Sequence, residues 1–117
     1  MVSYDVESLF TNVPVQQTID IILHKLFPMD DCRFNGFCKN DFKKLLDLAV
    51  RDTVFVFNGC SYSQIDGMAM GSPLGPIFAG IFMCSLEEHM LDSCPLSYHP
   101  LFYKRYVDDT FALFKSV

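Results

Sequence analysis

The stretch Leu101–Lys115, LFYKRYVDDTFALFK, largely determines the predicted fold of this chain. It contains two runs, LFYKRYV and TFALF, whose aromatic and β-branched residues favour strands. The adjacent carboxylates Asp108 and Asp109 interrupt these runs, and acidic pairs are common in turns. The sequence therefore predicts an antiparallel hairpin with two carboxylates at its turn. Lys104 and Arg105 precede this turn, and strand alternation sends one of them to each face of the sheet, without indicating which.

The segments upstream of this hairpin are predicted from hydrophobic spacing and helix-start residues. A short strand is predicted over Met1–Glu7, and a helix begins at Pro14 and continues to about Phe27. After a loop, Asn40 is predicted to cap a second helix that ends near Arg51. The predicted core-facing side of this second helix consists of Phe42, Leu45, Leu46 and Ala49.

A second hairpin and a long helix complete the predicted order. Thr53–Phe57 and Cys60–Ile65 are predicted strands joined by Asn58 and Gly59, which can both take positive φ. Apolar residues then recur at helical spacing from about Pro73 to Asp92. The predicted solvated end of that helix carries Glu87, Glu88 and Asp92. This order of elements predicts an α+β fold with an antiparallel sheet covered on one face by helices.

Composition limits the classes of protein that this chain can belong to. Its 117 residues correspond to about one domain, at roughly 100–200 residues per domain. Half of the residues are apolar, 15% are aromatic and only 20% are charged, which predicts a packed core rather than disorder. The net charge of -5 argues against a protein that holds nucleic acid mainly through a basic surface.

The cysteines and the longest apolar stretch give no sign of secretion or of membrane insertion. The five cysteines include no CxxC pair, and no secretory leader follows Met1, so reduced intracellular thiols are predicted. His24, Cys32 and Cys38 do not have the spacing of a zinc site. Gly67–Leu86 is uncharged over 20 residues, but its early glycines and prolines favour a buried core helix over a membrane span.

Three carboxylates are candidates for a metal site. Asp5 lies within or at the end of the first predicted strand, and Asp108 and Asp109 lie at the hairpin turn. Adjacent strands of one sheet would bring them together as hard oxygen ligands for Mg²⁺, and such a cluster of like charges needs a cation. Two ions about 3.5–4 Å apart would suit phosphoryl transfer. The alternative is that the acidic pair is only a turn signal.

The bend GMAMGSPLGP, residues 67–76, is a second candidate site. Its glycines and Ser72-Pro73 place accessible backbone beside a helix start, where a base, sugar or phosphate can approach closely. The alternative is an ordinary start of a helix. Phe10, in the run DVESLFTNVP, belongs either to the core or to a pocket beside the carboxylates.

Three stretches together resemble a known family. SYDVESLFTNVP, GMAMGSPLGP and FYKRYVDD, in that order, resemble motifs A, B and C of reverse transcriptases, most closely those of Penelope-like retroelements. The resemblance spans nearly the whole chain. It implies the palm of an RNA-directed DNA polymerase, with residues 1–117 as a partial domain that lacks complete fingers and thumb.

The resemblance also implies roles for individual residues. Asp5 and Asp108 would hold two Mg²⁺ ions, with Mn²⁺ as an alternative, and Asp109 would be the accompanying acid. The carbonyl of Val6 would add a metal contact. Phe10 would be the aromatic gate that excludes a ribose 2′-hydroxyl. The remaining implied site residues are Met70 and Gly71 at the nucleotide, and Ser72, Pro73 and Tyr106 at the template and primer.

Two positions depart from the family pattern. Met70 replaces the usual glutamine of motif B, and a thioether cannot donate the hydrogen bonds of an amide. Gly75 stands where serine is commoner. Contacts that the glutamine makes elsewhere are therefore not expected from this chain.

The resemblance predicts a retroelement nucleotidyltransferase. Its expected partners are an RNA template, a DNA primer, deoxynucleoside triphosphates and the fingers and thumb segments of a longer polymerase, with no membrane. An intracellular location is expected, nuclear for an active enzyme. Two alternatives stand beside it: an inactive relic or interaction module, and another palm-type two-metal enzyme such as a nucleotidyl cyclase. A cyclase has no template to position, which argues against the last of these.

Overall fold

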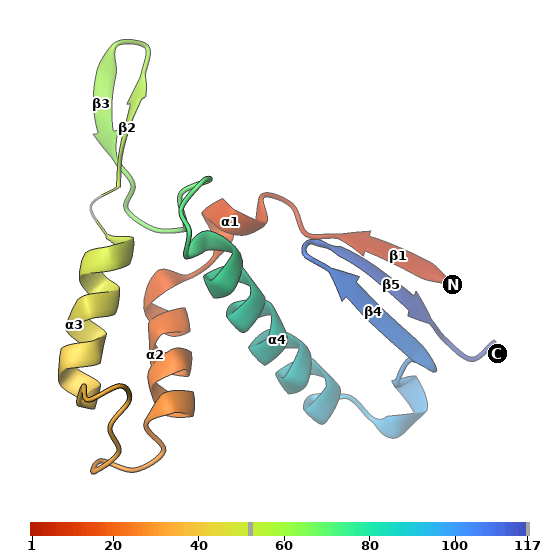
Figure 1. Cartoon of the computed structure of the whole chain (residues 1–117). Coiled ribbons are helices and arrows are strands. Elements are labelled where there is room, and N and C mark those ends of the chain that lie inside the picture. The colour runs from red at the N-terminus through yellow and green to blue at the C-terminus, as the bar shows by residue number, and fades with distance from the viewer. Residues whose placement is uncertain (52, 117) are drawn as a thin grey trace.

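The computed structural model describes residues 1–51 and 53–116, and both of its sheets are antiparallel (Figure 1). In chain order the elements are β1 (Val2–Asp5), α1 (Leu9–Asn12), α2 (Val15–Leu26), α3 (Lys39–Val50), β2 (Val54–Phe57), β3 (Cys60–Ser63), α4 (Gly75–Ser93), the 3₁₀ turn η1 (Leu96–Tyr98), β4 (Phe102–Tyr106) and β5 (Asp109–Leu113). The predicted α+β class is confirmed.

The three-stranded sheet joins the two ends of the sequence. Its strand order is β1-β5-β4, so β5 lies in the middle. Asp5 at the end of β1 lies opposite Asp109 at the start of β5, and Tyr106 at the end of β4 lies opposite the same residue. This register brings residues about a hundred positions apart to one end of the sheet.

The two faces of this sheet have different surroundings. Thr110 and Ala112 are buried on one face, and Arg105 of β4, opposite Thr110, is on the same side. Lys104, opposite Phe111, is on the other side together with Asp5 and the exposed Phe111 ring. The structure thus settles which of the two adjacent basic residues occupies which face.

The predicted Asn58-Gly59 hairpin is confirmed as a separate two-stranded ribbon, β2–β3, which projects away from the helices (Figure 1). Asn58 has φ 51° and Gly59 has φ 77°, values that these two residue types tolerate. The ribbon exposes a largely apolar set of side chains: Val54, Phe55, Val56, Phe57 and Tyr62.

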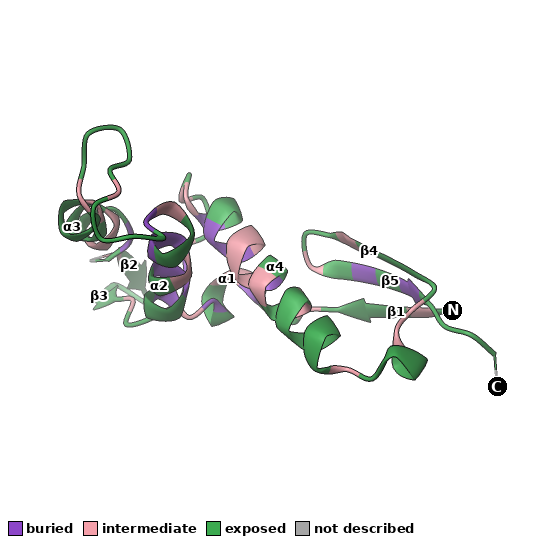
Figure 2. Cartoon of the chain, turned by 90° about the horizontal axis from the view of Figure 1, so that it is seen from below, coloured by how far each residue is buried: buried purple, intermediate pink, exposed green. Residues whose placement is uncertain are grey.

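The core lies between the helices. Apolar residues from α2 and α4 pack with α1 and the residues around it, and Ile19 and Phe78 are at most 1% exposed. Figure 2 shows the buried positions concentrated in α2 and in the first half of α4. The predicted helix from Pro14 to about Phe27 is confirmed, since Pro14 and Phe27 cap α2.

The molecule is a slab of 51 × 48 × 18 Å rather than a stack of layers. Helices α3, α2 and α4 follow one another side by side, with the three-stranded sheet next to α4 (Figures 1 and 2). The predicted cover of helices over the sheet is therefore limited to α4. This arrangement arises because α2 packs its apolar face against α4, and α3 packs against α2.

Several sequence predictions about the helices are corrected by the structure. Cys38, not Asn40, is the N-cap of α3. Leu45 and Ala49 are exposed although a core position was predicted for them, because α3 is the outermost helix of the slab and packs only against α2. The short helix α1 was not predicted. In the part of the chain that the structure describes, no helix has the length and apolarity needed to cross a bilayer.

Candidate functional site

Three carboxylates meet at the end of the three-stranded sheet where β1 stops and β5 begins. Oxygen atoms of Asp5, Asp108 and Asp109 all lie within 4.8 Å of one another. Asp5 and Asp109 are exposed and Asp108 is half-buried. The antiparallel register explains this convergence, because it sets Asp5 opposite Asp109 and leaves Asp108 in the adjoining turn. We call these residues the acidic triad.

The turn that carries Asp108 is conformationally unusual. Its two central residues are Val107 and Asp108, so Asp109 starts β5 rather than sharing the turn as the sequence predicted. The φ angle is positive, 56°, at Val107 and not at Asp108, which is the pattern of a type II′ turn. Glycine is the usual residue at that first position, and a β-branched residue there is strained. Surrounding contacts must therefore hold the turn in place.

One such contact comes from the chain just after β1. The amide of Val6 donates a 3.0 Å hydrogen bond to the carbonyl of Asp108. It joins the turn to the segment that leads from Asp5 into α1. Val6 thus fixes the turn through its N–H group, whereas the metal contact implied by the resemblance is through its carbonyl.

A second set of contacts comes from α4 and centres on Arg105. Nε of Arg105 lies 2.5 Å from Oε1 of Glu87, and Nη1 donates a 2.8 Å hydrogen bond to the carbonyl of Val107. The hydroxyl of Tyr103 donates to the same Glu87 oxygen at 2.6 Å. Glu87 is 19% exposed, so its predicted place in the solvated end of the helix is wrong. The side chain of Arg105, 18 positions later in the sequence, covers Glu87 in the folded chain.

These contacts shift two pKa values. Partial burial, and then the hydrogen bond and charge of Glu87, raise the pKa of Tyr103 to about 12. Burial acts to lower the pKa of Arg105, but the hydrogen bond and charge of Glu87 outweigh it and the net shift is upward. Both groups therefore keep their protons across the physiological pH range.

The triad suits a hard divalent cation by its chemistry. It offers only carboxylate oxygens, which are the ligands that Mg²⁺ and Mn²⁺ accept, and it contains no softer donor. Three carboxylates within 4.8 Å repel one another, and a bound cation would relieve this repulsion. The residues thus fit the implied metal.

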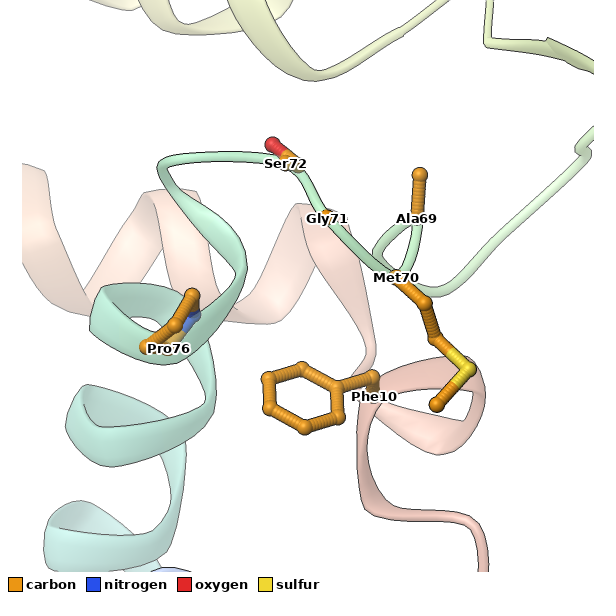
Figure 3. Close-up of a pocket in the computed structure, with 6 residues that line it drawn as sticks. All are labelled: Phe10, Ala69, Met70, Gly71, Ser72 and Pro76. Carbon is orange, nitrogen blue, oxygen red and sulfur yellow. The ribbon is translucent and has the colours of Figure 1, made fainter.

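A pocket of about 360 Å³ lies where α1 meets the predicted bend (Figure 3). Its wall combines the ring of Phe10 with the bend and the start of α4, and the lining residues are Phe10, Ala69, Met70, Gly71, Ser72 and Pro76. A Cβ atom at Gly75 would stand 3.5 Å from the Phe10 ring, which is an ordinary van der Waals distance, so the ring lies against the start of α4. The structure thus brings Phe10, Met70, Gly71 and Ser72 together, and Pro73 is not among the lining residues.

The bend is fixed to the chain around α1 by hydrogen bonds that the sequence did not suggest. Oδ1 of Asp66 accepts bonds from the amides of Val15, at 3.1 Å, and Gly67, at 2.9 Å. The amide of Met68 donates to the carbonyl of Phe10 at 2.6 Å. Gly67 has φ +80°, and an added Cβ would overlap the carbonyl oxygen of Thr11. Asp66 caps α2 at Val15, which lies 51 residues earlier in the sequence. Sequence patterns of helix caps involve neighbouring residues, so this contact was not predicted.

The acidic triad and the pocket are connected through one short segment. Residues 5–10 lead from Asp5 through Val6 into the first turn of α1, which carries Phe10. Tyr106, 81% exposed, precedes the turn on the same face of the sheet as Asp5 and Asp109. No protein-family model matches the sequence, and it has no significant match among the curated proteins. Function is therefore inferred from the site itself.

Proposed function

We propose that this chain is the palm region of an RNA-directed DNA polymerase, which adds deoxynucleotides to a primer 3′-hydroxyl on an RNA template. The observation that carries the proposal is the acidic triad, formed by an aspartate that ends one strand and two from the turn of its neighbour hairpin. The second support is the pocket between Phe10 and the bend. Both features fall on the three stretches that resemble polymerase motifs.

The triad residues would act as the metal-holding group. Asp5 and Asp108 would bind the ions, with Asp109 completing the negative cluster at the mouth of the site. A pair of Mg²⁺ ions, when bound, supplies activation of a hydroxyl nucleophile and stabilisation of a leaving pyrophosphate. Asp5 and Asp109 are exposed, so a primer end and a triphosphate could reach the ions from solvent.

The pocket would hold the incoming nucleotide and the template base. The Phe10 ring forms one wall and is the group that would collide with a ribose 2′-hydroxyl. Gly71 has φ +91°, and a Cβ atom added there would meet no atom within 4 Å, so its backbone is open to a ligand. Met70 is 82% exposed and offers an apolar, adaptable contact in place of an amide. Tyr106 would contact the primer end.

Primer extension tests this function. The purified chain would be given an RNA template, a DNA primer, deoxynucleoside triphosphates and Mg²⁺, beside the variants Asp108→Asn and Asp30→Asn. Asp30 is an exposed acid in the loop after α2, so its variant is a control for net charge. We expect extension by the parent chain and by Asp30→Asn and none by Asp108→Asn. Lack of any Asp108-dependent extension would contradict intrinsic polymerase activity.

The gate role of Phe10 has its own test. Phe10→Ala opens the wall of the pocket, so we expect the ratio of ribonucleotide to deoxynucleotide use to rise by about tenfold or more, as one steric contact permits. Unfolding in urea is measured in parallel, because Phe10 also packs against the core. An unchanged ratio in a folded variant would remove Phe10 from the nucleotide site.

The exposed apolar surface favours a second candidate, an interaction module that docks other protein segments. Four consecutive residues of β2, Val54 to Phe57, are between 48% and 69% exposed, which is unusual for a free surface. The paired variant Val56→Ser with Phe57→Ser should then reduce self-association in sedimentation measurements. If the parent chain is as monomeric as this variant, the result would argue against this candidate.

A further inference from the structure

Asp108 is held from both of its flanking peptide groups. The peptide before it contains the Val107 carbonyl, which accepts the 2.8 Å hydrogen bond from Nη1 of Arg105. The peptide after it contains the Asp108 carbonyl, which accepts the 3.0 Å hydrogen bond from the Val6 amide. With both peptide planes tied, the direction in which the Asp108 side chain leaves the backbone is fixed.

Arg105 is itself anchored in α4. Its guanidinium contacts both carboxylate oxygens of Glu87, at 2.5 and 3.5 Å, and the Cys84 sulfur at 3.5 Å. The Arg105 side chain is 13% exposed, so this pair is well shielded compared with Lys25–Glu88, whose side chains are 53% and 67% exposed. A shielded guanidinium with several hydrogen bonds is held rigidly, because its planar group donates all of these bonds in one fixed geometry.

The turn needs such a rigid contact because its own sequence does not favour its conformation. Val107 takes φ 56°, where a β-branched side chain is strained, and glycine would be free of that strain. A turn with this sequence would relax to another shape without outside contacts, and relaxation would move Asp108 away from Asp5 and Asp109. The contacts of Arg105 are therefore placed where the triad depends on them.

We propose that Arg105 is a positioning residue that holds Asp108 in the acidic triad by tying the Val107 carbonyl to Glu87 of α4. The proposal rests on the proposed function only in that the triad binds a divalent cation. It assigns to the α4–β4 ion pair a role in metal affinity, beyond its role in joining helix and sheet.

Electrostatics alone predicts a different result. Arg105 carries a positive charge next to the turn that bears Asp108, so if charge were its only influence its removal would leave cation binding unchanged or strengthen it. If Arg105 positions Asp108, its removal should weaken cation binding, because the third ligand is no longer held. Lys104 provides the matched control, since it is the adjacent basic residue, lies on the face of the sheet that carries Asp5, and has no contact with Glu87 among the interactions of the described residues.

The first test measures Mn²⁺ binding to the whole chain by electron paramagnetic resonance. It compares the parent with Arg105→Gln, Lys104→Gln and Asp108→Asn. We expect Arg105→Gln to raise the dissociation constant at least about threefold, the lower end of the effect of losing one hydrogen bond. Lys104→Gln should bind Mn²⁺ as tightly as the parent or more tightly. Equal or tighter binding by Arg105→Gln than by Lys104→Gln would overturn the proposal.

The second test is amide hydrogen exchange, which needs no metal. The Val6 amide reports the bond to Asp108, and the Ile19 amide in α2 reports the stability of the whole fold. In Arg105→Gln the Val6 amide should exchange at least about tenfold faster while Ile19 is unchanged. A matching acceleration at Ile19 would mean general destabilisation and would overturn the positioning role.

Glu87→Gln and a double variant sharpen both readouts. Glu87→Gln should give an intermediate effect on the Val6 amide, since Arg105 keeps its bond to Val107 but loses its anchor in α4. In the double variant Glu87→Gln with Arg105→Gln, the effect on the Val6 amide should equal that of Arg105→Gln alone. If the parent shows no Asp108-dependent Mn²⁺ binding, the proposed function fails, whereas hydrogen exchange still decides whether Arg105 holds the turn.

Discussion

The helical body and the three-stranded sheet are stabilised in different ways. In the body, α2 and α4 enclose apolar side chains, and Ile19, Phe78 and Val13 are at most 1% exposed. In the sheet, the described side chains that are buried are Thr110 and Ala112, and the open face carries exposed aromatic rings beside the acidic triad. The body is held by packing, and the sheet is held by backbone pairing and by a few polar contacts to its neighbours.

This difference explains how carboxylates can gather without being buried. A charged cluster inside the apolar body would carry a large desolvation cost, whereas the open end of the sheet leaves Asp5 and Asp109 in contact with solvent. The site then depends on polar ties, Val6 to Asp108 and Arg105 to Val107, to keep its geometry. Packing supplies the stability of the molecule, and hydrogen bonds supply the shape of the site.

The largest expected contrast is between two phenylalanines, one in each region. Phe78 is 1% exposed and Phe111 is 37% exposed on the open face of the sheet. Phe78→Ala should lower the free energy of unfolding by about 3–5 kcal/mol, because it leaves a cavity in a packed core. Phe111→Ala should cost about 1 kcal/mol or less, the contribution of a cross-strand pair. Urea denaturation measures both, and equal losses would refute the contrast between packed body and open sheet.

A smaller effect is expected from the two hairpin turns. Asn58 and Val107 have nearly the same φ, 51° and 56°, but asparagine tolerates this angle and valine does not. Asn58→Val should destabilise the β2–β3 ribbon by about 1–2 kcal/mol, because nothing outside the ribbon holds its turn among the described contacts.

Val107→Gly should behave differently. Relief of the strained φ and the greater freedom of glycine in the unfolded chain are of similar size, so the free energy of unfolding should change by less than about 1 kcal/mol. Urea unfolding measures the stability of Asn58→Val and of Val107→Gly, and amide exchange in the β2–β3 ribbon measures the local effect of Asn58→Val. A larger loss from Val107→Gly than from Asn58→Val would show that the Val107 turn is not strained.

The smallest expected effect is a pH dependence from Tyr103. Its pKa is raised from 10.0 to about 12 in the folded chain by burial and by Glu87, with Arg105 and Cys84 also nearby. Because the folded state holds this proton more tightly, the stabilisation is present below pH 10 and is lost as the pH rises toward 12.

The expected loss is about 1 kcal/mol or less, since the group is partly exposed and solvent screens it. The decrease in urea stability between pH 10 and pH 12 should be smaller in Tyr103→Phe than in the parent. The same decrease in both chains would attribute the pH dependence to other groups.

Local patterns in the sequence predicted most of the elements and the convergence of the triad. The Asn58-Gly59 turn and helix α2 follow from residue types and spacing alone. The meeting of Asp5 with Asp108 and Asp109 follows once β1 and the last hairpin share a sheet. These features were predictable because each depends on short segments or on the pairing of strands.

The remaining features depend on contacts between distant segments. The sequence placed Glu87 in solvent, because only the folded chain brings Arg105 over it. It placed the turn at Asp108-Asp109, because valine is a poor turn residue and the shift to Val107-Asp108 requires outside contacts. Asp66 caps a helix 51 residues away, and the side-by-side order of the helices is set by which apolar faces meet.

We expect the three carboxylates to form one cation site. A Mn²⁺ titration of the whole chain, monitored by nuclear magnetic resonance, is the sharpest test of this expectation. Bound Mn²⁺ broadens the amide signals nearest to it. We expect the signals of Asp5, Val6, Asp108 and Asp109 to broaden first and Asp108→Asn to abolish this, while the exposed pair Asp30 and Asp31 is unaffected at the same concentration. Equal broadening at Asp30, Asp31 and the triad, or broadening of the triad that survives Asp108→Asn, would refute a single site.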